Sequence, residues 1–262
     1  MANPMSSTSE PDFQLDWAKE LIYNGHTLPM SWRPLITELH LYFEENETDL
    51  AFLLGLDNLR ILRLSGSAIT DFTPLQRLGA LQELDLGYSN IGDLGPLSTL
   101  RNLQELELIE TPVRDLAPLA GLTSLKHLKF AKTSVNDLAP VVALLNLQEL
   151  NLKQTSVSNL SPLKGLTALK DVSLSYTNVT DLAPLASLVD LRHLNLAGIK
   201  VGDFTLLKAF KSLATLNLSN TRITDISPLE YVSQLEWLWL ADTDVSCLVP
   251  LGGGLSRCPR CV

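Results

Sequence analysis

The sequence predicts an α/β repeat solenoid, in which short similar units stack along one axis and share a continuous core. Leucines recur every 22 residues, and each opens the pattern Leu-x-x-Leu-x-Leu. They are Leu59, Leu81, Leu103, Leu125, Leu147, Leu169, Leu191, Leu213 and Leu235. A fixed period in this range is typical of stacked repeat architectures. The 45% hydrophobic and 6% aromatic content also favours a mostly aliphatic core.

The Leu-x-x-Leu-x-Leu part of each unit predicts a short β-strand. Alternation places the fourth and sixth positions in the core and the third, fifth and seventh on the opposite face. Because successive units run in the same direction, the sheet is expected to be parallel. Parallel sheets are ordinarily covered on both faces. Here one face carries Glu, Lys, Asn and Ser, so we expect it to face water or a partner.

Three positions in each unit, two polar and one proline, predict turns rather than catalytic or ligand-binding sites. The ninth position is Ser or Thr in most units, and we expect its hydroxyl to bond turn backbone groups of neighbouring units. The thirteenth is usually Asp, which favours turns by bonding amides just ahead. The sixteenth is usually Pro, which fits the first turn of a short helix or 3₁₀ helix. Such a short return segment would curve the stack towards the sheet.

The N-terminal part predicts a disordered start over residues 1–12 and a cap over residues 13–35. Apolar residues from Phe13 onward have helical spacing, with Asp12 as the expected N-cap and Asn24-Gly25 as the end of the helix. A stacked solenoid has open hydrophobic ends that terminal segments must cover. Trp17 and Trp32 are therefore interpreted as cap packing.

The repeats themselves are expected to form ten units over residues 36–256, followed by a C-terminal tail over residues 257–262. The first unit, which begins at Ile36, is irregular. It is 23 residues long, and the acidic loop from Glu44 to Asp49 replaces the usual turn.

The charge balance bounds the possible partners. The chain carries 29 acidic and 20 basic residues, for a formal net charge of -9. Nucleic-acid binding requires a basic footprint, so we expect none. No apolar run approaches the roughly 18–20 residues of a membrane span, so no membrane is expected. The acidic charge suits a soluble protein, which we expect to be a monomer, and a basic protein partner.

The cysteines and the N-terminus favour a cytoplasmic location. Cys247, Cys258 and Cys261 do not form a disulfide framework, which is typical of a reducing compartment. The start shows no basic segment followed by an apolar run, so no secretory signal is expected. Its Ser/Thr/Pro-rich composition leaves open secretion through a signal-peptide-independent route. A lone Cys-x-x-Cys lacks the four ligands of structural zinc, so no metal or cofactor is expected, and a loose tail or a disulfide remains open.

The unit pattern LxxLxLxxTx(I/V)xDLxPLxxL resembles the leucine-rich repeat superfamily over residues 36–256. It is most similar to the short 22-residue class of the internalins and of the leucine-rich regulatory subunit of protein phosphatase 1. The resemblance implies a curved right-handed solenoid that binds proteins on its concave sheet. The family usually has Asn at the ninth position, where this chain has Thr or Ser. The signal peptide and surface anchor of internalins are not visible here, so their targets are not carried over.

Two candidate binding patches lie on the expected concave face. Glu83, Asp85, Glu105 and Glu107 form a two-by-two acidic block with Glu110 at its edge. The block is either a docking patch for a basic partner or a solvated face. In the second case Arg63 relieves it on one side and the pairs Glu105–His127, Glu107–Lys129 and Glu110–Lys132 on the other.

The second patch is aromatic. Trp237 and Trp239 point the same way from the last strand, as interface anchors do, unless the tail from Gly252 folds over them. Tyr88 and Tyr176, at the eighth position, are expected to add contacts at the rim.

The sequence does not predict an enzyme. Asp171, Ser173 and His193 are triad residue types on adjacent strands, and Asp171 is within reach of His193. Ser173 lies diagonally, however, and no strained nucleophile turn is visible. We therefore expect a bacterial-type, non-enzymatic protein–protein interaction scaffold. The alternatives are an exported effector acting on a host protein and a non-catalytic regulatory subunit.

Overall fold

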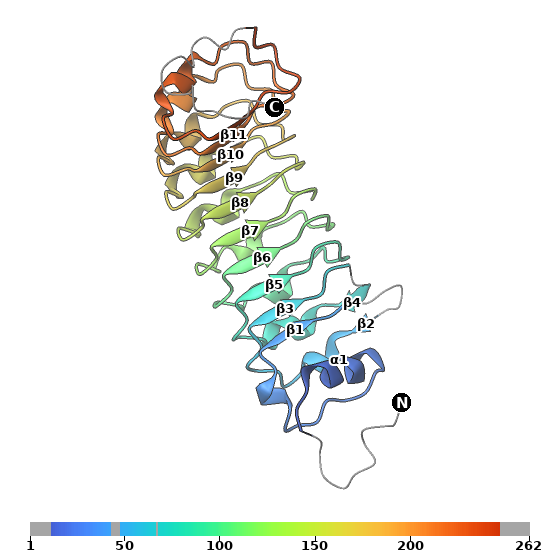
Figure 1. Ribbon diagram of the computed structural model, residues 1–262. Helices are drawn as coiled ribbons and strands as arrows, with labels where there is room; N and C mark the ends of the chain where they lie inside the picture. Colours follow the sequence, from blue (N-terminus) through green and yellow to red (C-terminus); the bar gives the residue numbers. More distant parts are fainter. Residues whose placement is uncertain (1–11, 43–47, 67, 247–262) are drawn as a thin grey trace.

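The chain folds into an elongated stack with one open parallel sheet along its length (Figure 1). The computed structural model describes residues 12–42, 48–66 and 68–246. The ten strands of the sheet are β1 (Glu38–His40), β3 (Ile61–Arg63), β5 (Glu83–Asp85), β6 (Glu105–Glu107), β7 (His127–Lys129), β8 (Glu149–Asn151), β9 (Asp171–Ser173), β10 (His193–Asn195), β11 (Thr215–Asn217) and β12 (Trp237–Trp239). A second, two-stranded sheet joins β2 (Thr48–Asp49) and β4 (Ile69–Asp71). The expected parallel solenoid is confirmed.

Each strand pairs with its neighbour in the same register. In one such pair, Glu149, Leu150 and Asn151 lie opposite Asp171, Val172 and Ser173. The middle residue of every strand points into the core and is at most 2% exposed. These residues are Leu39, Leu62, Leu84, Leu106, Leu128, Leu150, Val172, Leu194, Leu216 and Leu238. The predicted inward position is therefore confirmed at each strand centre.

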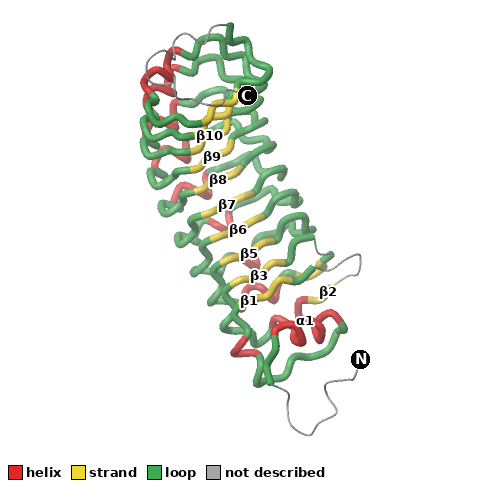
Figure 2. The backbone as a smooth tube through the Cα atoms, in the orientation of Figure 1, coloured by secondary structure: helices red, strands yellow, loops and turns green. Residues whose placement is uncertain are grey.

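Short 3₁₀ helices form the side opposite the sheet (Figure 2). They are η2 (Arg33–Leu35), η3 (Leu50–Leu53), η4 (Thr73–Arg77), η5 (Gly95–Leu97), η6 (Ala117–Leu119), η7 (Ala139–Ala143), η8 (Ser161–Gly165), η9 (Ala183–Ser187), η10 (Thr205–Ala209) and η11 (Ser227–Tyr231). Pro occupies the first turn of nearly all of them, where a backbone amide would have no helical partner. The expected helical return segment is confirmed as 3₁₀.

The thirteenth-position carboxylates and amide make the predicted turns. From Asp71 to Asp225, each side chain accepts a hydrogen bond of 2.8–2.9 Å from the backbone N–H two residues ahead. This bond lowers the pKa of Asp71 and of Asp225. Asp49 makes the same bond to Ala51, so the expectation that the first unit lacks this turn is wrong at Asp49. The rest of that acidic loop, residues 43–47, lies outside the described residues.

The ninth-position hydroxyls act within their own unit, not between units as expected. Each threonine donates a hydrogen bond of 2.6–2.8 Å to the carbonyl three residues earlier, which belongs to the inward sixth position just after the strand of its own unit. The chain turns sharply just before the threonine, which brings the hydroxyl back over that carbonyl. The donors are Thr111, Thr133, Thr155, Thr177, Thr221 and Thr243.

A column of left-handed residues makes that turn, at the eighth position of the nine units from Gly66 to Asp242. Only Gly66 and Gly198 in this column are glycines. The others have φ between 55° and 61°: Tyr88, Glu110, Lys132, Gln154, Tyr176, Asn220 and Asp242. From Gly66 to Asn220, each backbone N–H in the column donates to the seventh-position carbonyl of the next unit. The left-handed turn thus extends the inter-unit ladder beyond the strand, and it offsets part of the steric cost that L-residues incur there.

The N-terminal helix α1 (Leu15–Tyr23) lies against the first unit (Figure 1). Its N-cap is Gln14, without a side-chain cap bond, so the prediction of Asp12 is wrong. Asn24 ends the helix as expected. Trp32 is 3% exposed and its ring meets Phe13 edge-on at 5.7 Å. Within the described part of the chain, no helix has both the length and the apolar character of a membrane span.

Replacing one strand-centre leucine should unfold the stack. Leu150→Asp places a carboxylate where the side chain is 0% exposed, without a partner. We expect a loss of more than about 4 kcal/mol in unfolding free energy, because a buried charge adds to the lost leucine packing. Ser158→Asp introduces the same residue at an exposed position and should leave the thermal midpoint nearly unchanged. Circular dichroism melts that shift equally for both variants would contradict the assignment of inward positions.

Replacing a left-handed residue by glycine should stabilise the protein. Gln154 is exposed and has φ 55°. Relief of roughly 1–2 kcal/mol of steric cost exceeds the roughly 0.5–1 kcal/mol entropic cost of glycine. Gln154→Gly should therefore raise the melting temperature by about 2 °C. Ser156→Gly, two residues away and outside the left-handed column, should lower it, and a fall in both variants would contradict the explanation.

Candidate functional site

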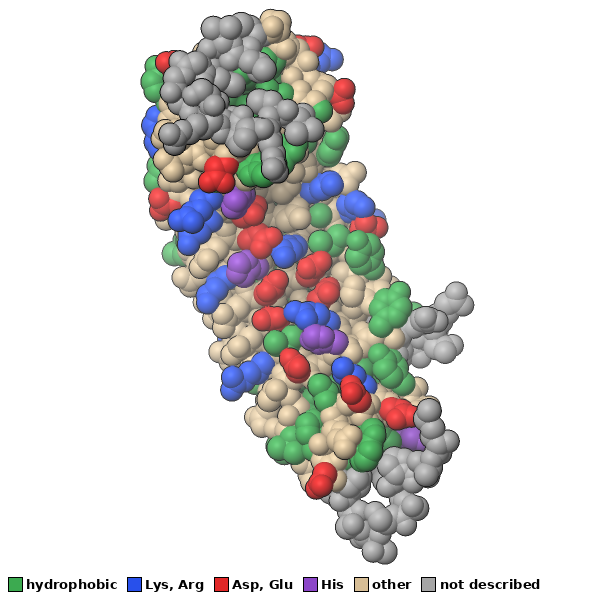
Figure 3. Space-filling model, viewed as in Figure 1, with side chains coloured by type: hydrophobic (Ala, Val, Ile, Leu, Met, Phe, Trp, Pro, Cys, Tyr) green, Lys and Arg blue, Asp and Glu red, His purple; other side chains and the backbone are tan. Residues whose placement is uncertain are grey.

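The open face of the sheet presents two columns of side chains, from the third and fifth positions of the units. Acidic side chains gather midway along this face, with Lys, Arg and His among them (Figure 3). The strand register places Glu83 beside Glu105 and Asp85 beside Glu107. These four residues, the acidic block, therefore lie side by side as the sequence predicted, and their charges repel one another.

Basic residues at the edges of the acidic block neutralise it only in part. Arg63 Nη2 lies 3.3 Å from Glu83 Oε2, and the Arg63 Nη1 atom lies 3.1 Å from His40 Nε2. At the rim, Lys132 pairs with Glu110, as predicted. Among the described residues, Glu107 has no ion pair.

The other two expected ion pairs are wrong. Lys129 Nζ lies 3.6 Å from Glu105 and 3.5 Å from Glu149, instead of pairing with Glu107. His127 Nδ1 lies 3.1 Å from Glu149, not from Glu105. Glu149 flanks both basic residues on the adjacent strand β8, so His127 pairs with Glu149 alone and Lys129 lies between Glu149 and Glu105.

Burial and the excess negative charge of the open face shift the pKa values of some of its side chains. Burial raises the pKa of Glu107, and the nearby charge of Asp85 raises it further. Burial and then Glu149 raise the pKa of Asp171. Burial opposes the charged form of Lys129, but Glu149, Glu105 and Glu107 raise its pKa overall. The face therefore carries carboxylates that lack enough local cations.

The seventh position, expected to belong to the open face, is buried in some units and half-buried or exposed in the others, as at Lys153 and Ala241. Ala131, Ser175 and Ala197 are at most 5% exposed. The chain turns left-handed immediately after this position, and fifth-position side chains fold over its backbone. Asn151 and Asn195 illustrate this, because each accepts a hydrogen bond of 3.1 Å from the amide two residues ahead.

The aromatic candidates occupy the end and the rim of the sheet. The rings of Trp237 and Trp239 stack at 6.0 Å between centroids, tilted by 15°. Tyr88 and Tyr176 are 59% and 47% exposed, as rim residues should be. A Cβ atom on Gly198 would lie 2.4 Å from the Tyr176 ring, so this glycine makes room for the ring. The tail that was suggested to cover the tryptophans lies outside the described residues.

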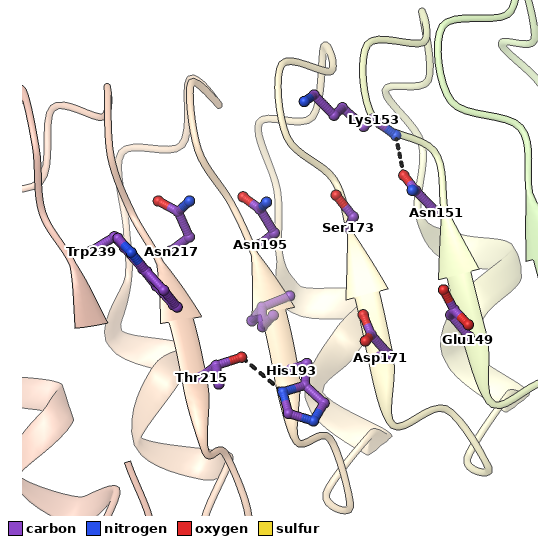
Figure 4. A pocket seen from close by; sticks show the side chains of 11 residues that line it. Glu149, Asn151, Lys153, Asp171, Ser173, His193, Asn195, Thr215, Asn217 and Trp239 are labelled. Atoms are coloured by element: carbon purple, nitrogen blue, oxygen red, sulfur yellow. Dashed lines mark hydrogen bonds between the residues drawn. The ribbon is translucent and has the colours of Figure 1, made fainter. Parts of the chain in front are cut away.

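A polar groove of about 530 Å³, which the sequence did not identify as a site, runs across β8 to β12 on the open face (Figure 4). Its floor includes Asp171, Ser173, Asn195, Asn217 and Trp239. The signal that could have revealed it is the run of Asn and Ser at the fifth position in consecutive units. We call this feature the polar groove.

The groove does not assemble a catalytic triad. His193 Nδ1 lies 2.8 Å from Thr215 Oγ1, on the side away from Asp171 (Figure 4), so the expected contact between Asp171 and His193 is not formed. The Ser173 hydroxyl lies 3.3 Å from that of Ser175. In the described ranges, no cluster of three or more His, Cys, Asp or Glu side chains is arranged to hold a metal ion. Cys247, Cys258 and Cys261 lie outside those ranges.

The comparisons with known proteins agree with this geometry. A family model described as Leucine Rich repeats (2 copies) matches residues 189–231. An internalin, InlF, from Listeria monocytogenes is 30% identical, with a TM-score of 0.82 over 90% of this chain and 71% of its own. This chain belongs to the leucine-rich repeat superfamily. Among its members, it resembles the internalins.

More distant leucine-rich repeat proteins share the fold. A protein from Leptospira interrogans is 21% identical, with a TM-score of 0.74 over 90% of this chain and 68% of its own. Mouse RP105, solved as a complex with MD-1, is 24% identical, with a TM-score of 0.68 over 83% of this chain and 40% of its own. No curated protein sequence matches the chain. Leucine-rich repeat proteins commonly serve as protein-interaction scaffolds.

Removing the charge of Glu107 should stabilise the protein near neutral pH. The pKa of Glu107 is raised in the folded protein, so ionisation of this carboxyl opposes folding. The stability that the protonated carboxyl contributes is present at low pH and is lost as pH rises through the folded-state pKa. Glu107→Gln should raise the melting temperature at pH 7 by about 1–2 °C, since the repulsion at this half-buried, partly solvated carboxylate is worth less than about 1 kcal/mol. The gain should disappear below about pH 4, near the ordinary carboxyl pKa.

Glu83→Gln provides the matched control for this titration. Glu83 is paired with Arg63, so its neutral variant should not stabilise the protein at pH 7. Thermal melts at several pH values measure both variants. A gain for Glu107→Gln that is independent of pH would contradict the electrostatic explanation.

Proposed function

We propose that this protein is a non-enzymatic scaffold that binds a partner protein with a basic surface on the open face of its sheet. The charge of the face is the observation that carries the proposal. Strands β5 to β9 present six carboxylates and one lysine. The carboxylates are Glu83, Asp85, Glu105, Glu107, Glu149 and Asp171.

A basic partner would relieve the repulsion that this face carries when unoccupied. A cationic side chain placed beside Glu107 and Asp85 would meet carboxylates that have no counter-ion among the described residues. Complementary charge accelerates encounter and selects partners more than it adds affinity. The acidic block would therefore guide a partner to the sheet, and the aromatic residues at the rim and end would supply apolar contacts.

The comparisons support a protein partner in general terms. Mouse RP105 was solved in complex with MD-1, and a plant peptide hormone receptor was solved with RGF2. Both have this fold, although the receptor is only 17% identical, over 84% of this chain and 39% of its own, with a TM-score of 0.64. The identity of a partner and the cytoplasmic location of this chain remain predictions.

Charge reversal within the acidic block should abolish partner capture. The full chain, immobilised, is used to capture proteins from a lysate of its source cells, which are identified by mass spectrometry. The double variant Glu105→Lys and Glu107→Lys should lose any partner that the parent retains, with an affinity at least about tenfold lower. Melting curves of each variant confirm that the fold is intact.

A matched control reverses two charges away from the sheet. Asp190 and Glu230 are exposed and lie outside the sheet strands, so Asp190→Lys with Glu230→Lys makes the same change in net charge. This variant should retain the partner. Equal loss in both double variants would show that only net charge matters, and no loss in either would contradict binding at the acidic block.

A further inference from the structure

The two ends of the polar groove differ in chemistry. On β9, Asp171 is half-buried and its carboxylate makes no ion pair or hydrogen bond with any residue that the structure describes. On β12, Trp239 presents an indole that is stacked against Trp237. Neighbouring strands lie about 4.8 Å apart, so three steps cover about 14 Å across the sheet. Asp171 aligns with Trp237, so Trp239 lies two residues, or about 7 Å, further along the strand, and the two ends are about 16 Å apart. The groove therefore offers an anionic end and an aromatic end at a defined spacing.

Hydrogen-bond donors occupy the floor between those ends. Asn195 and Asn217 each accept a hydrogen bond at Oδ1 from the backbone amide two residues ahead, at 3.1 and 2.9 Å. This orientation leaves the Nδ2 hydrogens of both side chains for a ligand. Figure 4 shows the two amides side by side above the groove floor. The middle of the groove therefore fits a ligand with a row of acceptors.

We infer that the polar groove binds an extended peptide segment with a lysine or arginine at one end and an aromatic or apolar side chain about four to six residues along. An extended chain advances about 3.3 Å per residue, so four to six residues span about 13–20 Å, a range that includes the distance from Asp171 to Trp239. Its backbone carbonyls meet the donors of Asn195 and Asn217. Its cation meets Asp171, with Glu149 beside it on β8.

This inference rests on the proposed function and specifies the form of the partner. The groove is a surface separate from the acidic block, reaching from β8 to the last strand. A neutral oligosaccharide could stack on Trp239, but it supplies no cation for Asp171. The Asp171 carboxylate makes no ion pair among the described residues, and it therefore favours a basic peptide over a sugar.

The inference is tested with the full chain and a phage-displayed library of random linear peptides. Enriched sequences should combine Lys or Arg with an aromatic or apolar residue about four to six positions away. The affinity of one selected peptide is then measured by fluorescence anisotropy. Asp171→Asn and Trp239→Ala should each weaken it by at least about tenfold. Asp190→Asn makes the same change of carboxylate to amide at an exposed position outside both the groove and the acidic block, and should retain the affinity.

A double-mutant cycle locates the cation. Replacing the basic residue of the peptide by glutamine should weaken binding to the parent, but should add little to the loss in Asp171→Asn. Trp239→Phe keeps an aromatic ring and should retain most of the affinity, which separates stacking from a folding defect. Circular dichroism checks the fold of each variant.

The inference falls if no linear sequence is enriched, or if Asp171→Asn and Trp239→Ala both leave peptide affinity unchanged. It also falls if a neutral oligosaccharide from a glycan array, and no peptide, binds in a way that depends on these two residues. Either result leaves the proposed function intact if reversal at Glu105 and Glu107 still abolishes capture of a folded partner. Conversely, the peptide could bind in the groove while charge reversal at Glu105 and Glu107 leaves partner capture unchanged. That result would overturn only the role of the acidic block.

Discussion

Each 22-residue unit of this protein buries its leucines against the units on either side. A single unit is too short to enclose its own apolar side chains, so the stack is the smallest stable structure. The parallel register brings identical positions together, and Leu128, Leu150 and Val172 show this in three adjacent strands. Stacking therefore also places each remaining position of a unit beside the same position in the next unit. The columns of side chains on the open face follow from that constraint.

The polar residues of the unit serve two different purposes. Thirteenth-position carboxylates and ninth-position hydroxyls satisfy backbone groups where the chain leaves and rejoins the strand. Their bonds recur with nearly constant length, from Asp93 to Asp225 and from Thr111 to Thr243. Third- and fifth-position residues vary between units, because the open face imposes little packing on them. Variation within an otherwise constant frame is what makes this face a candidate binding surface.

Charge is distributed unevenly along that variable face. The middle strands carry the acidic block, and towards the C-terminal end the carboxylates give way to Asn, Ser and Trp in the polar groove. Lys129 joins Glu105 to Glu149 at the boundary between the two regions. A basic partner that contacted both regions would be attracted first by the carboxylates, which repel one another, and would then meet the directional hydrogen-bond donors. Long-range attraction and short-range recognition are thus placed on neighbouring strands of one surface.

The sequence by itself determined the fold, because a strict period of 22 residues fixes the register of the strands from β3 to β12. It also determined the Asp and Pro turns, the acidic block and the exposed tyrosines, since all of these follow from position within the unit. Tertiary structure decided what depends on side-chain direction. Lys129 and His127 turn towards Glu149 because its carboxylate lies across the strand boundary from both. The left-handed column at the eighth position was hidden because residues as different as Tyr88 and Gln154 adopt one backbone conformation there. The polar groove likewise needed three dimensions, because five strands contribute one or more residues each, and periodicity alone does not show which side chains remain available to a ligand.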